Sequence, residues 1–291
     1  MSGGPDSLAL LLLAHAARPG EIEAATVDHG LRSGSADEAA VVARICAALG
    51  IPHETLTVEV GPGNLQSEAR AARYAAMADW MERRGLAALA TGHHADDQAE
   101  TLLMRLNRAS GVAGLAGVRA RGVLPGTRLP LLRPLLDWRH AELQSIVTEA
   151  GLEAAQDPSN EAERFDRVRI RKALAEADWL DVPALAASAA HLAEADAAID
   201  WAAGREWAER VERQPGGLLY RPQAPRAVAL RVIGRIIAEL GEEAPRGSAL
   251  ARVFDSLLAR QPASIGELVA RPMPGGWSFT AAPQRRSAGD Q

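Results

Sequence analysis

Short apolar segments alternate with amphipathic helical segments through the first half of this chain, and this alternation constrains the fold more than any other feature. The apolar segments at residues 22–27, 53–60 and 86–90 have the length and composition of strands. Strands that alternate with helices are typical of a parallel sheet with helices on its faces. The sequence therefore predicts an α/β fold with a doubly wound, mostly parallel sheet.

Five helices are expected in the same half of the chain. Their apolar residues recur at helical spacing over residues 7–17, 35–49, 65–84, 96–108 and 138–150. Gly50 and Gly151 follow two of these helices, at a position where a left-handed residue favours termination. Residues 111–134 are rich in glycine, proline and leucine, which predicts a loop or short hairpin beside the sheet, at the rim of the site.

The pattern changes after Pro183. Helices are predicted at residues 183–212, 224–240 and 248–260, followed by a hairpin over residues 267–282 that turns at Pro274-Gly275-Gly276. A chain of 291 residues exceeds the usual length of a single domain. We therefore predict a catalytic domain at residues 1–182 and a second, smaller, mostly helical domain at residues 183–291.

Composition excludes several classes of protein. The apolar stretch at residues 8–17 is too short to cross a bilayer and lacks the flanks of a signal peptide, so we expect a cytoplasmic protein with no membrane span. Cys46 is the only cysteine, which excludes an internal disulfide and a cluster held by several cysteines. The net charge of −5 offers no overall attraction to nucleic acid, so such a partner must meet a local basic cluster.

A glycine-rich loop at the start of the chain is the strongest candidate for chemistry. Ser2-Gly3-Gly4-Pro5-Asp6-Ser7 runs directly into an apolar helix, where backbone N–H groups and the helix dipole attract an anion such as phosphate. Asp6 could hold a magnesium ion against the phosphates. The spacing and the lysine of a Walker loop are absent. The alternative is a glycine turn with Asp6 and Ser7 as ordinary helix-start residues.

Acidic side chains follow the third predicted strand. Residues 91–101 read Thr-Gly-His-His-Ala-Asp-Asp-Gln-Ala-Glu-Thr, and helical spacing places Asp97, Glu100 and Thr101 on one face. The carboxylates therefore point toward the strand ends. An alternative is that they only stabilise a helix start. A zinc site from His93, His94 and Asp97 is disfavoured, because adjacent histidines are poor joint ligands without a third defined partner.

Arginines gather at two places. Arg70 and Arg73 lie one helical turn apart, which suits clamping phosphate or nucleic-acid oxygens, and Tyr74 offers a stacking surface. The second cluster comprises Arg164, Arg167, Arg169, Arg171 and Lys172. Arginines paired with Glu68, and a solvated helix face, are the respective alternatives.

Together these motifs resemble the tRNA(Ile)-lysidine synthase family. The first loop is similar to the signature loop of the N-type ATP pyrophosphatases, the PP-loop superfamily with the adenine nucleotide alpha hydrolase-like fold. Other similar segments follow in the family's order at residues 27–32, 68–74, 91–101, 133–137 and 157–160. The resemblance covers about residues 1–175 and only loosely the helices that follow, which are similar to a tRNA-binding appendage.

The resemblance implies an ATP-dependent ligase that uses Mg²⁺. ATP would adenylylate the first-anticodon cytidine of an isoleucine tRNA, and free L-lysine would then displace AMP to give lysidine. The implied nucleotide-binding residues are Ser2, Gly3, Gly4, Pro5, Asp6, Ser7, Asp28 and His29, with Asp6 as the metal ligand. The implied catalytic residues are Asp6, Arg73, Asp97 and Glu100. The implied lysine- and tRNA-binding residues are His93, Asp97, Glu100, Arg70, Arg73, Arg167, Arg169 and Arg171.

Two departures from the family pattern leave alternatives open. Family members carry an apolar strand before the loop, whereas this chain begins at Met1-Ser2, so we expect either a truncated or misassigned start or an empty sheet position. Val168 stands where the family has asparagine. The alternatives are another PP-loop tRNA-modifying enzyme, such as a thiolase, and a catalytically inactive RNA-binding relative. The oligomeric state is open, with a homodimer as one alternative.

Overall fold

The structure is a computed structural model that describes residues 1–30, 35–58, 65–155, 166–242 and 247–282. The chain divides into two units. The N-terminal unit contains residues 1–109 and 114–191, and the C-terminal unit contains residues 110–113 and 192–291. Helix α8 (Val182–Arg210) runs through this division, which falls between residues 191 and 192, after the boundary at residues 182 and 183 expected from the sequence.

Strands and helices alternate in the N-terminal unit, as predicted. The main helices are α1 (Pro5–Ala17), α2 (Ser35–Ala48), α3 (Leu65–Arg84), α4 (Ala95–Leu106), α6 (His140–Glu149) and α7 (Asp166–Glu176). The short α5 (Val112–Leu115) follows α4, and its residues are divided between the two units. The strands are β1 (Ala24–Asp28), β2 (His53–Thr57), β3 (Leu89–Ala90), β4 (Arg121–Val123) and β5 (Pro130–Leu132). Each helix and strand predicted in the first half overlaps one of these elements. Gly50 and Gly151 have φ values of 68° and 69°, which confirms the two predicted helix ends.

The strands described in this unit form two hydrogen-bonded sheets. β1 and β2 pair in parallel, with Ala24 opposite His53. β3 pairs in parallel with β5, and β5 pairs antiparallel with β4. The hairpin predicted within residues 111–134 is therefore present, but its second strand joins the sheet through β3 instead of lying beside it.

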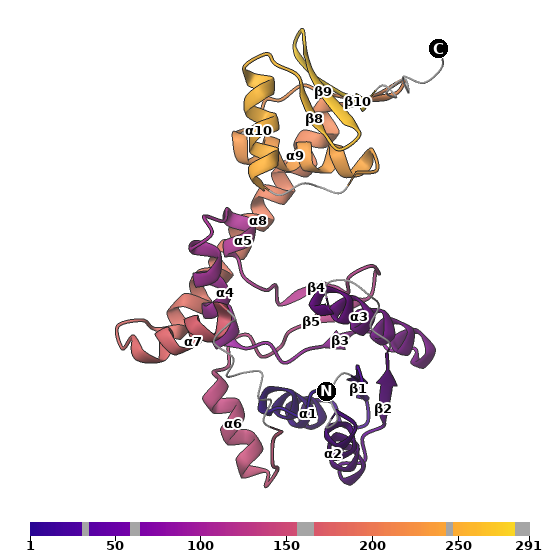
Figure 1. Cartoon of the computed structure of the whole chain (residues 1–291), viewed down its shortest axis with the longest axis vertical. Coiled ribbons are helices and arrows are strands. Elements are labelled where there is room, and N and C mark those ends of the chain that lie inside the picture. Colours follow the sequence, from indigo (N-terminus) through magenta and orange to yellow (C-terminus); the bar gives the residue numbers. More distant parts are fainter. Residues whose placement is uncertain (31–34, 59–64, 156–165, 243–246, 283–291) are drawn as a thin grey trace, which may run out of the picture. The chain divides into compact units, whose positions relative to one another are not determined.

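Helices cover both faces of β1. Ala24 packs with Val42 and Cys46 of α2, whereas Val27 packs on the side of Tyr74 and Met81 of α3. Figure 1 accordingly shows α2 and α3 on opposite sides of β1 and β2. Because the faces of a parallel sheet are buried, its strands are apolar without a strict alternation. This arrangement is the doubly wound fold expected from the sequence.

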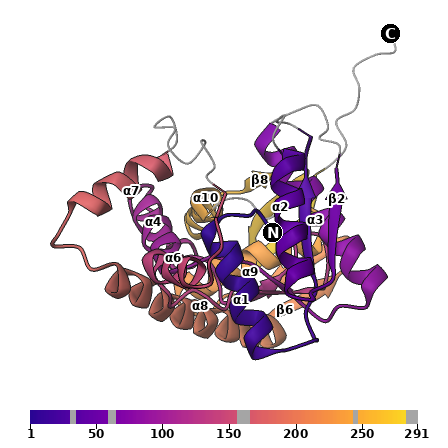
Figure 2. The ribbon, with the colours of Figure 1, turned by 90° about the horizontal axis from the view of Figure 1, so that it is seen from below.

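Two helix pairs complete the N-terminal unit. Leu8 and Leu10 of α1 pack with Leu143 and Val147 of α6. Helices α4 and α7 also pack together, and both pairs lie side by side in Figures 1 and 2. The start of α1 is thereby brought close to residues far along the chain.

The C-terminal unit combines helices with an antiparallel sheet. Its elements after α8 are α9 (Arg226–Glu239), α10 (Gly247–Leu258), β6 (Val211–Gln214), β7 (Gly217–Tyr220), β8 (Ala263–Ile265), β9 (Leu268–Met273) and β10 (Gly276–Ala281). The sheet order is β6-β7-β10-β9-β8. β9 and β10 form the hairpin predicted at residues 267–282. Strands β6, β7 and β8 were not predicted from the sequence, because each is short and β6 is largely exposed, so none shows a clear alternating pattern.

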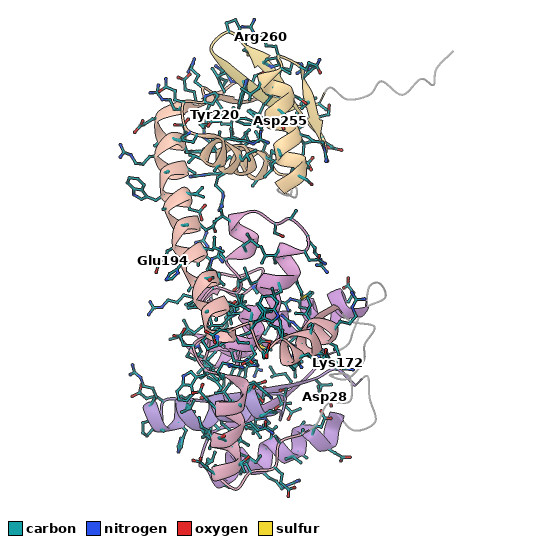
Figure 3. All side chains as sticks on the ribbon, turned by 90° about the vertical axis from the view of Figure 1, so that its left-hand side faces the viewer. Asp28, Lys172, Glu194, Tyr220, Asp255 and Arg260 are labelled. Carbon is teal, nitrogen blue, oxygen red and sulfur yellow. The ribbon has the colours of Figure 1, made fainter. Side chains whose placement is uncertain are left out.

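Aromatic side chains lie at the centre of the hydrophobic core of the C-terminal unit. Tyr220, labelled in Figure 3, is fully buried, and its ring meets the Trp277 ring edge-on at 5.8 Å between centroids. The Phe254 ring of α10 also meets the Trp277 ring edge-on, at 5.4 Å between centroids. Such edge-to-face pairs add about 0.5–1.5 kcal/mol beyond the burial of their area. Among all the described residues, no helix has both the length and the hydrophobicity needed to cross a membrane.

Candidate active site

The loop at residues 2–7 leads into α1 without a side-chain cap. Gly4 is the residue before the helix, Pro5 begins it, and no side-chain cap hydrogen bond is present among the described residues. Pro5 suits this position because a proline lacks only an N–H that would have no helical partner. The start of α1 is therefore a place where backbone N–H groups and the helix dipole favour an anion.

Close packing holds this loop in place. Gly3 has a φ of 75°, which favours glycine, and its carbonyl accepts a 2.9 Å hydrogen bond from the Ala155 amide. The hydroxyls of Ser2 and Ser7 lie 3.1 Å apart, and Ser7 Oγ donates to the Gly4 carbonyl. A Cβ atom at Gly92 would lie only 2.9 Å from the Asp6 carbonyl oxygen. Glycine at position 92 therefore lets the segment after β3 approach α1.

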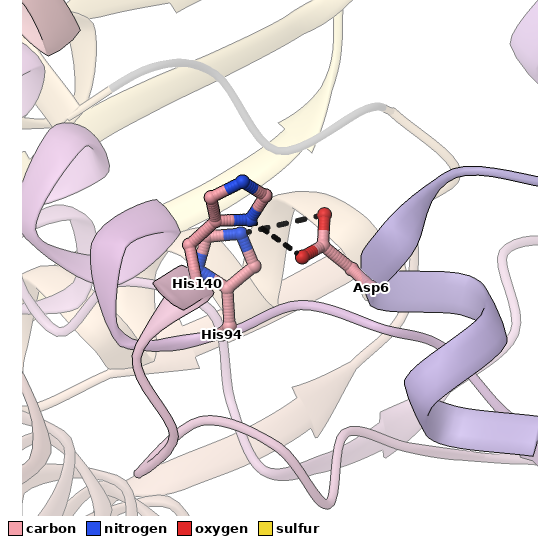
Figure 4. A group of neighbouring side chains, drawn as sticks. All are labelled: Asp6, His94 and His140. Atoms are coloured by element: carbon pink, nitrogen blue, oxygen red, sulfur yellow. Dashed lines mark hydrogen bonds and ion pairs between the residues drawn. The ribbon is translucent and has the colours of Figure 1, made fainter. Parts of the chain in front are cut away.

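Asp6 joins three elements of the N-terminal unit. One carboxylate oxygen lies 2.8 Å from Nδ1 of His140 at the start of α6, and the other lies 3.6 Å from Nε2 of His94 before α4. Figure 4 shows both Asp6 oxygens facing these two rings, whose centroids are 5.3 Å apart. Burial alone would raise the pKa of Asp6, but the hydrogen bond with His140 and the interaction with the nearby His94 ring hold it below its ordinary value.

His94 is buried among three carboxylates. Its Nε2 lies 3.6 Å from both Asp6 and Asp97, and its Nδ1 lies 3.5 Å from Asp96. Burial would lower the pKa of His94, yet Asp6, Asp96 and Asp97 together raise it to about 10. The three carboxylates therefore make this position strongly favourable for a positive charge.

Asp96 is held by residues that precede and begin α6. It accepts hydrogen bonds from Arg139 at 3.0 and 3.2 Å and from the His140 amide at 2.8 Å. No role was predicted from the sequence for Asp96, Arg139 or His140, and His94 was considered only within a disfavoured zinc site. His94 and Asp96 lie inside a motif that the sequence shows, but a histidine at the start of a separate helix, such as His140, carries no local signal of a partner at Asp6.

Asp28 and His29, the residues predicted to bind adenosine, lie near Arg73. Asp28 ends β1, and its carboxylate accepts the Gly30 amide at 2.9 Å, which forms a turn after the strand. Arg73 of α3 donates to Nε2 of His29 at 3.3 Å. Burial first, and then the charge of Arg73, lower the pKa of His29. The structure thus brings Asp28, His29 and Arg73 together at the carboxyl end of β1, where open α/β sheets bind ligands.

Glu100 differs from the open carboxylate that the sequence suggested. It is 1% exposed, and Arg171 and Arg167 of α7 contact its carboxylate at 2.7 and 3.2 Å. Arg167 also donates to the Thr101 hydroxyl at 3.1 Å. Glu100 therefore joins α4 to α7, and its negative charge is already matched by two guanidinium groups.

The other site residues predicted from the sequence are His93, Arg169 and Arg70. His93 lies 3.1 Å from the Thr91 hydroxyl, and burial together with nearby arginines lowers its pKa. Arg169 is exposed on α7. Arg70 lies over the Tyr74 ring at 4.9 Å, but Tyr74 is only 7% exposed and packs in the core. The prediction that Tyr74 offers a stacking surface is therefore wrong. Arg32, Arg164 and residues 157–160 lie outside the described residues.

Comparisons with known proteins agree with this arrangement. Residues 1–178 match the family model of the PP-loop domain. The chain is 48% identical to the tRNA(Ile)-lysidine synthase of Novosphingobium aromaticivorans, over 99% of this chain and 89% of that protein. It is 40% identical to the enzyme of the same name from Zymomonas mobilis, over the same shares of the two chains.

A solved structure supports the fold. The U34-tRNA thiolase from Methanococcus maripaludis, described with its 4Fe-4S cluster, aligns with a TM-score of 0.54 and 19% identity over 66% of this chain and 68% of that chain. At this identity the likeness concerns the fold alone. The sequence identities, in contrast, extend over nearly the whole chain, and the chain belongs to the tRNA(Ile)-lysidine synthase family.

Proposed function

We propose that this protein is a cytoplasmic tRNA(Ile)-lysidine synthase that joins free L-lysine to the first-anticodon cytidine of an isoleucine tRNA at the expense of ATP. The observation that carries the proposal is the uncapped start of α1, where Asp6 contacts the segment that begins α4. Family membership supplies the reaction class, because curated relatives with this name match over nearly the whole chain.

ATP is proposed to place its phosphates at the start of α1. The amides of the loop that contains Ser2, Gly3, Gly4, Pro5, Asp6 and Ser7 would receive them, as anions are bound at helix starts. Asp28 and His29 would hold the adenosine at the end of β1. Arg73, already at 3.3 Å from His29, would neutralise charge on the α-phosphate.

Mg²⁺ is proposed to bind beside Asp6. Asp6 and Asp97 each lie 3.6 Å from the same nitrogen of His94, so two carboxylates lie beside the start of α1. Mg²⁺ is commonly held by one or two carboxylates together with substrate phosphates. Bound there by Asp6, the ion would stabilise the negative charge of the departing pyrophosphate.

The reaction consists of two displacements. The C2 oxygen of the cytidine attacks the α-phosphate of ATP, and pyrophosphate leaves. The ε-amine of lysine, once deprotonated, attacks C2, and AMP leaves with the oxygen. Loop amides and Arg73 are proposed to stabilise charge in the first step, and a carboxylate or phosphate oxygen accepts the amine proton in the second.

Asp97 is the better proposed partner for the lysine ammonium. Its side chain is 15% exposed and touches the His94 ring, whereas Glu100 is already paired with two arginines. Glu100 instead enters the proposal as the residue that holds Arg167 and Arg171. His93, beside Asp97, would complete the lysine pocket.

Arginines are the proposed contacts for tRNA. Arg70 on α3 and Arg167, Arg169 and Arg171 on α7 are exposed to solvent. Guanidinium groups bind phosphate oxygens well, and local clusters are needed because the net charge is −5. The C-terminal unit is proposed to assist as a tRNA-binding appendage.

The homodimer stays a prediction, which sedimentation at several protein concentrations would test.

The thiolase alternative is weakened by the cysteine content. Cys46 is the single cysteine in the sequence and is buried in the core against α1 and α2. It therefore offers neither a pair of catalytic thiols nor several ligands for an iron–sulfur cluster. An inactive RNA-binding relative would differ by showing no turnover with ATP.

The proposal is tested by product analysis. The purified chain is incubated with ATP, Mg²⁺, lysine and an isoleucine tRNA, and the nucleosides are analysed by mass spectrometry. Lysidine, AMP and pyrophosphate are expected, and ADP as the main nucleotide product would overturn the assignment. Asp6→Ala should abolish turnover, whereas Asp37→Ala, an exposed carboxylate in the first turn of α2, should retain it.

A further inference from the structure

Asp6, His94 and His140 bring three potential metal-ligand atoms close together. The Asp6 carboxylate oxygen, His94 Nε2 and His140 Nδ1 all lie within 4.8 Å of one another (Figure 4). They come from α1, the residue before α4 and the first residue of α6. The close packing at Gly92 and the α1–α6 contact hold these elements together, so the cluster is preformed.

A small adjustment of these side chains would let them share one ion. Ligand atoms bound to zinc at about 2.0–2.2 Å in a tetrahedral arrangement lie roughly 3.2–3.6 Å apart. The Asp6–His94 distance of 3.6 Å lies at the upper end of that range, whereas the 2.8 Å hydrogen bond between the other Asp6 oxygen and His140 would lengthen when an ion binds. A separation of 3.6 Å is too long for a hydrogen bond. His94 therefore lies close enough to Asp6 for both side chains to bind one metal ion, but too far from it for a direct hydrogen bond.

A second observation concerns the other nitrogen of His94. His94 is 5% exposed, and its Nδ1 has no hydrogen-bond partner among the described residues, although Asp96 Oδ2 lies 3.5 Å away. Arg139 and the His140 amide hold Asp96 in that position. A carboxylate behind a buried histidine is the usual support of a metal ligand, because it orients the ring and increases its basicity.

We infer that Asp6, His94 and His140 form a binding site for a divalent transition-metal ion of the zinc class. Two imidazole nitrogens and one carboxylate suit Zn²⁺ or Co²⁺, whereas Mg²⁺ prefers oxygen ligands. The side chains of Asp6 and His140 are 31% and 45% exposed, so a fourth ligand position is open to solvent. Asp96 and Asp97 add negative charge that favours the ion.

Occupation of this site has a consequence for nucleotide use. The Asp6 carboxylate cannot bind Zn²⁺ at this site and the Mg²⁺ of an ATP complex at the same time. Zn²⁺ should therefore inhibit the reaction with ATP. This consequence rests on the proposed function, whereas the binding site does not.

Metal binding is tested with the ion alone. The full chain, freed of metal by a chelator, is titrated with Co²⁺ and followed by visible absorption, and Zn²⁺ affinity is measured by competition with a chromophoric chelator. One ion per chain with the intense absorption of tetrahedral Co²⁺ is expected. His140→Asn and Asp6→Asn should each weaken binding by at least tenfold, since even supporting residues are worth about 10–100-fold.

A matched control separates this site from adventitious binding. His191 is an exposed histidine on α8 outside the cluster, so His191→Asn should bind as the unaltered chain does. Equal affinity in His140→Asn and the unaltered chain would overturn the assignment. So would a purely octahedral Co²⁺ spectrum in the unaltered chain, a result that does not depend on how any variant folds. Neither outcome would touch the proposed ligase activity, which is measured with Mg²⁺.

Discussion

At the scale of single residues, the surroundings of a carboxylate decide what it can bind. Asp97 and Glu100 lie on the same helix with the same charge, and spacing alone makes them equivalent. The structure separates them, because Glu100 is buried against Arg167 and Arg171 whereas Asp97 faces the His94 ring. Their substitution should therefore affect different properties.

Asp97→Asn should impair the use of lysine more than the use of ATP. A hydrogen bond to a charged group contributes about 1.5–3 kcal/mol, so its loss should raise the Michaelis constant for lysine by roughly ten- to a hundredfold. Adenylylation of tRNA, measured without lysine, should be largely preserved. An unchanged lysine dependence in a well-folded Asp97→Asn variant would rule out this role.

Glu100→Gln provides the contrast to Asp97→Asn. The buried carboxylate loses its charge opposite two arginines, and we expect unfolding to become easier by about 1–3 kcal/mol, with both half-reactions reduced together. Thermal unfolding and lysine titration measure the two effects separately. A raised Michaelis constant for lysine with unchanged stability would instead make Glu100 a direct lysine ligand, as the family resemblance implies.

Glu206 is a buried carboxylate of the C-terminal unit that, like Glu100, has its partners within the protein. One of its oxygens accepts the amides of Gln223 and Ala224, at 2.8 and 3.1 Å, and the Tyr220 hydroxyl, at 3.2 Å. Glu206→Ala leaves these donors buried without an acceptor and should lower the free energy of unfolding by about 2–5 kcal/mol. Glu206→Gln keeps an oxygen there and should cost about 1 kcal/mol. Equal losses in urea unfolding of the two variants would contradict this account.

At the scale of elements, the approach of α1 to the segment after β3 depends on the absence of a side chain at Gly92. A Cβ atom there would lie 2.9 Å from a backbone oxygen, which cannot turn away as a side chain can. Gly92→Ala should therefore displace the start of α1, cost about 1–3 kcal/mol and impair ATP use. Unfolding experiments and the Michaelis constant for ATP test this expectation.

Gly204→Ala is the matched control for Gly92→Ala. Gly204 lies in α8, and a Cβ atom there meets no other atom within 4 Å. Alanine is favoured over glycine in a helix, so this variant should gain about 0.5–1 kcal/mol. The two substitutions should thus have opposite signs, and a stabilised Gly92→Ala variant with normal ATP use would disprove the close-approach argument.

At the scale of the whole molecule, a net charge of −5 means that affinity for tRNA must come from a few cationic side chains. Arg70→Gln should weaken tRNA binding and lower the dependence of log K on log salt by about one, as expected for the loss of one phosphate contact. Arg83→Gln is the control, because Arg83 lies on the same helix but pairs with Glu54 at 2.7 Å. Equal salt dependence in both variants would exclude Arg70 as a phosphate contact.

The sequence by itself determined the alternation of strands and helices, the glycine-rich loop before α1 and the β9–β10 hairpin. These features are encoded locally, by apolar spacing along a segment and by turn residues such as Gly50 and Pro274-Gly275. The acidic motif after β3 was found for the same reason, since the spacing of Asp97 and Glu100 on one helix is a local property.

Only the tertiary structure decided which side chains meet. Asp6 and His140 are 134 positions apart in the sequence, and Glu100 and Arg171 are 71 apart, so neither pairing leaves a periodic trace in the chain. The burial of Tyr74 and the joining of β5 to β3 likewise depend on elements distant in sequence. Local spacing determines which face of an element a residue occupies, but packing between elements determines what that face contacts, and therefore whether a charge stays open to a ligand or is matched within the protein.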